Sequence, residues 1–365
     1  KEFFAASMTM DLSNQNKLSE FHEELKRINI KVIRPDINKC FADFQFDENN
    51  FYYALGGIKS VGYEAISNVV KERKANGEFK SISDFLNRVN PKDINKLQLE
   101  GLVKSGAFDS INNNRQALFN SIPNFILKTK NIYENKVANQ IDLFGETSEN
   151  DTDIVQNIEE WNFEERLARE FEAVGFFISD HPLNQFKEIF DDYKIIDYQK
   201  FNLNDDFKDA NIASTLLKVN ERKTAKGNSY AVLKLTDLSG VFELFIFSDT
   251  LELNREILKE GSSLILTLNK SISDNENRLK RINVRKVASL KDLFKSPIKE
   301  VTFNIKLEKQ LSEICDFLNK KGDTIVNINF SNDANSYNFQ LKNRRNIDRK
   351  SLNLLRNKEI NTIIN

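Results

Sequence analysis

Apolar residues in the first half of the chain recur at the three- and four-residue spacing of amphipathic helices. In residues 14–27 the repeated positions are Leu18, Phe21 and Leu25. Residues 30–33 are a short apolar run before Pro35, which predicts a buried strand because the residue before a proline is held extended. The pattern predicts a mainly helical first half, with helices over residues 14–27, 62–76, 94–104 and about 161–173.

Beyond about residue 206 the pattern changes to short β-rich runs separated by turn signals such as Ser239-Gly240. Five such runs suit a small barrel of the OB type. Within the third run, strict alternation places residues 243, 245 and 247 on one side, and we expect Phe245 and Phe247 to face the barrel core. The five runs are Ile212–Val219, Tyr230–Leu235, Phe242–Phe247, Ser263–Leu268 and about Arg281–Val287.

The last 65 or so residues, from Ile298, predict a compact α+β module in the order strand, helix, strand, strand, helix. The predicted fold class is therefore multi-domain α+β: a helical region, then an OB-type β-barrel, then a small α+β terminal domain. Residues 145–160 carry six acidic side chains and no basic one, which is typical of a solvated linker.

Composition narrows the classes of function. The chain has 365 residues with 53 basic and 54 acidic side chains, so any binding of nucleic acid must depend on local patches. No apolar run approaches the roughly 18 residues that span a bilayer, so we expect no membrane insertion. Two cysteines and two histidines cannot make a common metal-ligand cluster, and Cys40 and Cys315 are expected to be free thiols in a reducing cytoplasm. Because the chain opens on Lys1 with what resembles mid-domain sequence, we expect a piece of a longer protein.

Two short glycine-containing turns are candidates for contact with DNA phosphates. Small residues let the backbone amides at the start of the following helix face a phosphate, where the helix dipole also favours an anion. Residues 57–80 carry five basic and three acidic side chains, and residues 88–115 carry the same numbers. This suits sequence-independent binding of a duplex backbone, although two ordinary glycine-capped helix ends would explain the same residues. The candidates are Lys59, Ser60, Val61 and Gly62 in the first turn and Lys104, Ser105, Gly106 and Ala107 in the second.

A short apolar motif lies at the edge of the acidic linker. Its residues are Gln140, Ile141, Asp142, Leu143 and Phe144. An exposed Leu-Phe pair beside a solvated segment is unfavourable unless a partner buries it, which is typical of a linear binding motif. Alternatively, both side chains pack back onto their own domain.

Basic residues also flank the predicted barrel. Arg222, Lys223 and Lys226 lie near its first turn. With Tyr230, Phe242, Phe245 and Phe247 near the same strands, nucleobases of a single strand could stack over a basic groove, although these aromatic side chains could equally belong to the barrel core. A second basic run from Lys342 to Lys358 is interpreted as a solvated helix face. No catalytic set is found: the one Asp-x-Asp spacing, Asp151 and Asp153, falls in the linker, and His181 beside Pro182 suits a turn.

Taken together, these residues resemble the C-terminal part of the alpha subunits of bacterial replicative DNA polymerase III, the C-family DNA polymerases. The similarity runs along nearly the whole chain. The segments that carry it are Phe3–Ala6, Arg34–Asn38, Leu55–Gly62, Leu99–Asp109, Gln140–Phe144, Leu167–Pro182, Thr224–Gly227 and Leu238–Gly240.

The resemblance implies a succession of parts. These are the end of the polymerase fingers (1–50), a tandem helix-hairpin-helix duplex-binding region (51–136), a clamp-binding motif and acidic linker (137–160), a helical connector (161–205), an OB-fold nucleic-acid-binding domain (206–292) and a tau-binding-like domain (298–365). Lys59–Gly62 and Ser105–Ala107 fall on the two hairpins, and Gln140–Phe144 on the motif that binds the beta sliding clamp.

The implied partners are primer-template duplex, single-stranded template, the clamp, the tau subunit of the clamp loader and other holoenzyme subunits, in a bacterial cytoplasm. The segment itself is expected to be non-catalytic and to need no cofactor. The aspartates that hold two Mg²⁺ ions for nucleotidyl transfer belong, in the family, to a palm domain upstream of Lys1.

The chain departs from the family pattern at Ser60 and Asp180, where glycine is usual. Ser60 must form its turn without the conformational freedom of glycine. A free-standing accessory protein with the same DNA-binding parts and a clamp motif is the rival interpretation. An OB-bearing tRNA-binding enzyme is a weaker one, since no adenylate-binding motif is found.

Overall fold

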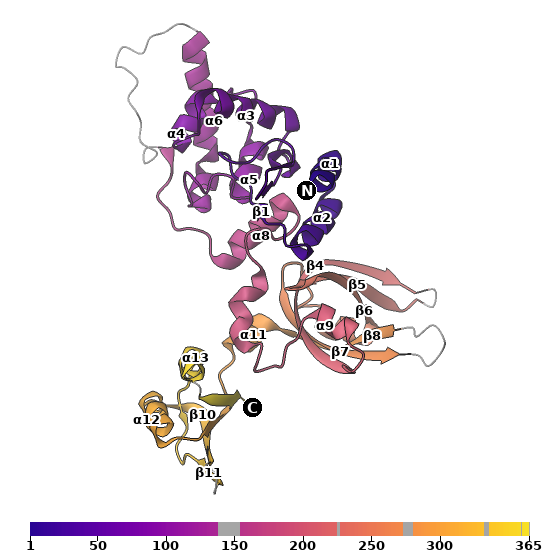
Figure 1. Ribbon diagram of the computed structural model, residues 1–365, viewed down its shortest axis with the longest axis vertical. Coiled ribbons are helices and arrows are strands. Elements are labelled where there is room, and N and C mark those ends of the chain that lie inside the picture. Colours follow the sequence, from indigo (N-terminus) through magenta and orange to yellow (C-terminus); the bar gives the residue numbers. More distant parts are fainter. Residues whose placement is uncertain (138–153, 225–226, 273–279, 332–335, 359, 365) are drawn as a thin grey trace. The chain divides into compact units, whose positions relative to one another are not determined.

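A computed structural model describes residues 1–137, 154–224, 227–272, 280–331, 336–358 and 360–364. The chain divides into two compact units, Lys1–His181 and Pro182–Asn365 (Figure 1). The multi-domain α+β class is confirmed. Among the described residues, no helix is both long and apolar enough to cross a membrane.

The N-terminal unit is mainly helical, as predicted. Its small sheet has the order β1-β3-β2, in which β1 is the predicted strand and pairs parallel with β3. One core, built around side chains such as Tyr53, Phe79 and Phe85, holds the unit together. The elements are α1 (Glu2–Met10), α2 (Gln15–Arg27), β1 (Val32–Ile33), β2 (Gln45–Phe46), β3 (Phe51–Tyr52), η1 (Leu55–Gly57), α3 (Tyr63–Asn76), α4 (Ile82–Arg88), α5 (Lys96–Lys104), α6 (Arg115–Val137) and α8 (Phe163–Val174).

Local signals in the sequence fix several of these helix ends. Asn95 and Gln98 form a reciprocal capping box at the start of α5, in which each side chain accepts a backbone N–H. Ser81 caps α4 and Asn162 caps α8 more simply, since in each case one side-chain oxygen accepts a backbone N–H of the first turn. The ends of these helices are therefore set by neighbouring polar residues, while their apolar faces build the common core.

The C-terminal unit begins with a connector and a five-stranded antiparallel sheet of order β6-β5-β4-β7-β8. The outer strands β6 and β8 contact each other, so the sheet curls back on itself. Helix α10 lies between β6 and β7 in the chain. The elements are η2 (Pro182–Ile189), α9 (Tyr198–Leu203), β4 (Asp209–Lys223), β5 (Ser229–Asp237), β6 (Gly240–Phe247), α10 (Ser248–Asn254), β7 (Ser263–Ile272), β8 (Lys280–Ser289) and α11 (Leu290–Lys295).

The phase of β6 differs from the prediction. Phe242, Leu244 and Ile246 are buried in the barrel core, whereas Phe245 and Phe247 are 50% and 48% exposed. The prediction that the latter pair faces the core was wrong, because the wholly apolar row of the strand takes the inner side and the row that contains Glu243 takes the outer side.

The terminal module of this unit has its own core and a four-stranded sheet of order β11-β10-β9-β12. It follows the predicted order and adds a final strand, β12, which the sequence analysis did not predict. The elements are β9 (Glu300–Ile305), α12 (Glu308–Phe317), β10 (Lys321–Ser331), β11 (Ser336–Gln340), α13 (Arg349–Asn357) and β12 (Asn361–Ile364).

Both cysteines are free thiols. Cys40 is buried, its Sγ donates to the carbonyl of Arg34 at 3.2 Å, and burial raises the pKa of this thiol to about 12. Cys315 lies on α12 and is exposed.

Candidate nucleic-acid interface

The first predicted hairpin lies at the surface. Lys59, Ser60 and Gly62 are exposed, and Val61 is buried beneath them. Gly62 is the N-cap residue of α3, and no side chain caps this helix. Since the first N–H groups of a helix have no acceptor within it, the start of α3 offers backbone donors a few residues after the exposed Lys59.

A close approach between backbones holds this hairpin in place. The N–H of Lys59 donates to the carbonyl of Ala173 in α8 at 2.9 Å. Behind the hairpin, a Cβ atom added to Gly101 of α5 would lie 2.7 Å from the Lys59 carbonyl oxygen. Only glycine therefore lets α5 pack this closely against the turn.

Ser60 adopts the left-handed conformation that the family pattern assigns to glycine, with φ of 65°. We expect Ser60→Gly to raise the free energy of unfolding by about 0.5–1 kcal/mol, because relief of roughly 1–2 kcal/mol of strain exceeds the added flexibility of the unfolded chain. Ser60→Val should lower it by about 1–2 kcal/mol, since a β-branched residue tolerates this conformation poorly. Urea unfolding followed through Trp161, the one tryptophan of the chain, measures both; equal stability of the two variants would contradict the expectation.

The second predicted hairpin is placed differently. Lys104, Ser105, Gly106 and Ala107 are all buried. The N–H groups of the last three donate to the carbonyls of Gly101, Val103 and Leu102 at 2.9–3.1 Å, and Gly106 has φ of 79°. This is the geometry of a glycine-capped helix end, the alternative interpretation, and it does not present these amides to a phosphate.

A buried ion network lies directly behind this turn, and the sequence analysis did not find it. Arg115 donates to Asp109 at 2.9 and 2.6 Å, to Glu170 at 3.3 Å and to the Lys104 carbonyl at 3.2 Å. Burial works against the charge of Arg115, but the bonds and charges of Asp109 and Glu170 outweigh it and raise its pKa. Glu170 is fully buried and also accepts the N–H groups of Ile178 and Ser179.

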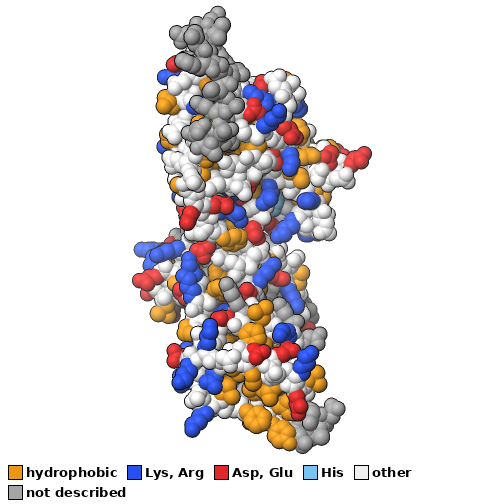
Figure 2. Space-filling view, turned by 90° about the vertical axis from the view of Figure 1, so that its left-hand side faces the viewer, with side chains coloured by type: hydrophobic (Ala, Val, Ile, Leu, Met, Phe, Trp, Pro, Cys, Tyr) orange, Lys and Arg blue, Asp and Glu red, His pale blue; other side chains and the backbone are white. Residues whose placement is uncertain are grey.

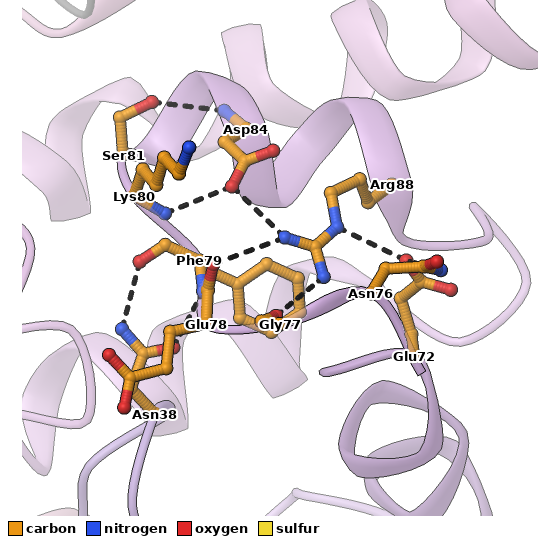
Figure 3. A network of polar contacts seen from close by, with 10 residues as sticks. All are labelled: Asn38, Glu72, Asn76, Gly77, Glu78, Phe79, Lys80, Ser81, Asp84 and Arg88. Carbon is orange, nitrogen blue, oxygen red and sulfur yellow. Dashed lines mark hydrogen bonds and ion pairs between the residues drawn. The ribbon is translucent and has the colours of Figure 1, made fainter. Parts of the chain in front are cut away.

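Other bases counted as surface charge are structural as well. Figure 3 shows Arg88 at the centre of a polar network, where it donates to Glu72, to Asp84 and to the Gly77 carbonyl and thus fixes the turn between α3 and α4. Arg73 is buried and donates to the carbonyls of Ile37 and Cys40. Within the described part of this region, the exposed lysines that form no ion pair are Lys59, Lys71, Lys74, Lys80 and Lys92, of which Lys74 lies over the Phe41 ring.

The outer face of the barrel brings aromatic and basic side chains together. Arg222 on β4 pairs with Tyr230 on β5, which pairs in turn with Phe247 on β6, so the three side chains form one row across the sheet. Phe245 lies beside this row, with its ring centroid 6.5 Å from that of Tyr230. Lys223 is exposed at the end of β4. Exposed rings beside cations form the kind of platform on which bases of a single strand stack.

Several predicted site residues lie outside the described residues. These are Lys226, the whole motif Gln140–Phe144, and the Asp151–Asp153 pair of the linker. Within the described ranges, no group of three or more His, Cys, Asp or Glu side chains could hold a metal ion. No residue there is therefore assigned to a metal.

The model of the helix-hairpin-helix motif family matches residues 29–118, which contain both turns. The N-terminal unit thus contains a helix-hairpin-helix region. Curated relatives extend the similarity well beyond this region. The chain belongs to the family of DNA polymerase III alpha subunits and corresponds to their C-terminal part.

Three relatives illustrate the extent of the match. The DNA polymerase III alpha subunit of Rickettsia bellii is 31% identical over 366 residues, which cover 91% of this chain and 31% of the relative. Those of Caulobacter vibrioides and Escherichia coli K12 are 31% and 30% identical, and each match covers 76% of this chain and 24% of the relative. The chain spans less than a third of the length of these relatives.

Proposed function

We propose that this chain is the C-terminal segment of a replicative DNA polymerase of the bacterial cytoplasm and holds DNA and protein partners during template-directed synthesis. The similarity to DNA polymerase III alpha subunits over most of the chain carries this proposal and supports a role in DNA replication. Nucleotidyl transfer, with its Mg²⁺ ions, is assigned to another segment of the polymerase. The residues of the present chain are proposed to bind and position DNA and protein partners.

Duplex DNA is proposed to contact the first hairpin. The exposed Lys59 side chain, the small residues Ser60 and Gly62, and the uncapped start of α3 support this, because together they offer a cation and backbone donors to one phosphate. The second turn is given a supporting role instead, since its amides are bonded within the fold.

Charge reversal tests this contact. In the full chain, Lys59→Glu should weaken binding of duplex DNA about fivefold to tenfold for every sequence, because the lost contact is with the backbone. It should also reduce the slope of log K against log salt concentration by about 0.9, the value for one phosphate. Fluorescence anisotropy with a labelled duplex measures both. Lys31→Glu, at an exposed lysine between α2 and β1, is the matched control, and equal binding by the two variants would refute the contact.

Single-stranded template is proposed to bind the outer face of the barrel. The exposed rings of Phe245 and Phe247 and the half-buried ring of Tyr230 would stack with nucleobases, while Arg222, Lys223 and Lys226 would neutralise phosphates. This face is called the barrel platform below. Its support is the register that aligns Arg222, Tyr230 and Phe247 across three strands.

Two protein partners complete the proposal. Gln140–Phe144 would bind the beta sliding clamp as a linear motif, and the terminal module would bind the tau subunit of the clamp loader. The module has its own core, and Leu307, Leu311 and Leu354 are exposed on or beside its helices, which supports contact with another protein.

A further inference from the structure

Two basic stretches that are distant in the sequence meet at one end of the terminal module. Lys320 and Lys321 lie at the start of β10, and Lys342, Arg344 and Arg345 lie between β11 and α13. The fold joins the two stretches: the Asn346 N–H donates to the Lys320 carbonyl at 2.9 Å, and Arg345 forms an isolated bridge with Lys321. These five residues are called the terminal basic cluster. Lys342, Arg344 and Arg345 precede α13, so the interpretation of the run as a helix face was wrong for these three residues and holds only for its part within Arg349–Asn357.

The cluster side chains differ in their ion pairing from the basic side chains that follow them in the sequence. Arg349 and Arg356 both bond to the buried carboxylate of Asp192, and Lys358 pairs with Glu313 at 3.6 Å. Within the described residues, no carboxylate pairs with any of the five cluster side chains. The Nε atom of Arg345 is buried without an acceptor there, and its Nη1 reaches only the Arg344 carbonyl, at 3.5 Å. Among the residues that the structure describes, the cluster is therefore a concentration of positive charge without an ion-pair partner.

An exposed aromatic pair lies on the strand that leads into the cluster. Tyr337 and Phe339 of β11 are 49% and 54% exposed, and their rings are nearly parallel, with centroids 6.3 Å apart. Strand β11 is an outer strand of the sheet, and all of its residues are exposed. Figure 2 shows hydrophobic side chains gathered at the lower end of the view, over the terminal module.

We propose that the terminal module binds single-stranded nucleic acid, with backbone phosphates on the terminal basic cluster and bases stacked on Tyr337 and Phe339. Sequence-tolerant binding of a single strand requires two components, cations that contact the phosphates and exposed aromatic rings on which the nucleobases stack. A duplex keeps its bases stacked within itself, so it would use the cations alone. An acidic peptide would likewise leave the aromatic pair without a role. This site is separate from the first hairpin and from the barrel platform.

The test uses the full chain in which Phe245→Ala and Phe247→Ala have weakened the barrel platform. Against this parent, Lys342→Glu with Arg344→Glu should lower the affinity for a labelled oligothymidylate at least tenfold. It should also reduce the salt slope by about 1.4, since each phosphate contact with a single strand contributes about 0.7. Tyr337→Ala with Phe339→Ala should lower the affinity about tenfold and leave the salt slope unchanged.

Lys306→Glu with Lys309→Glu, at exposed lysines before and within α12, is the matched control and should bind like the parent. Thermal unfolding by circular dichroism establishes that each variant is folded, and Lys342→Gln with Arg344→Gln replaces the reversed pair if that pair unfolds. Binding equal to the parent for both sets of variants would overturn the proposal. Loss with the charge variants alone would overturn the choice of a single strand and indicate a general polyanion site. The Phe245→Ala and Phe247→Ala parent, compared with the natural chain, reports separately on the barrel platform.

Discussion

Replacement of Arg115 by methionine is expected to lower the free energy of unfolding of the N-terminal unit by about 3–5 kcal/mol. Methionine fills a similar volume but leaves the carboxylate of Glu170 fully buried without a cation, and an uncompensated buried charge is costly. Loss of the bonds to Asp109 and to the Lys104 carbonyl adds to the effect. Urea unfolding can be followed at Trp161, which is buried in this unit against Phe119.

The control is Arg27→Met. Arg27 pairs with Glu24 on the exposed surface of α2, where solvent screens the interaction, and its loss should not change the unfolding midpoint measurably. If Arg115→Met is no more destabilising than Arg27→Met, the network does not stabilise the fold. The duplex affinity of the Arg115 variant, measured where the protein is still folded, should stay within about twofold of the natural chain, because Arg115 is buried and would touch no phosphate.

Replacement of Leu143 and Phe144 by alanine is expected to abolish retention of the chain on immobilised beta sliding clamp. If these two apolar side chains are the anchors of a linear motif, each contributes about 2 kcal/mol or more, so the pair should change the affinity at least several hundredfold. Surface plasmon resonance with the purified clamp measures this loss directly.

A matched control keeps the residue types and changes their position. Leu253 on α10 and Phe3 on α1 are a leucine and a phenylalanine that are strongly exposed, and their joint replacement by alanine should leave clamp binding as it was. Undiminished binding by the Leu143 and Phe144 variant would remove the clamp from the proposed function. The proposals for DNA would be unaffected, since they depend on other residues.

The sequence predicted the helical first half, the five barrel strands and the order of the terminal module, because apolar periodicity is set by which face each element buries. It could not distinguish the two glycine turns. Gly62 precedes a helix and Gly106 follows one, and both have small neighbours. What separates them is burial of the second turn against α6 and α8, which depends on packing between residues distant in the chain.

The sequence also could not show which basic side chains are free at the surface, because this depends on the same packing between distant residues. Arg73, Arg88 and Arg115 contribute to the basic count of the hairpin region, yet each is bonded to carbonyls or carboxylates of the fold. Conversely, Lys320 and Lys321 belong to the terminal basic cluster only because the start of β10 lies beside Arg345 in the fold. For the barrel, one residue could have corrected the phase of β6: Glu243 shares its row with Phe245 and Phe247, and an acid seldom faces a core.

The difference in exposure between the two thiols allows selective labelling of the chain. Because the Cys40 thiol is buried and stays protonated at neutral pH, a maleimide dye should react at Cys315 alone, on α12 of the terminal module. The natural chain can therefore carry a single fluorophore on that module without any engineered cysteine. Energy transfer from this dye to a labelled oligonucleotide would report directly on which part of the chain the strand visits.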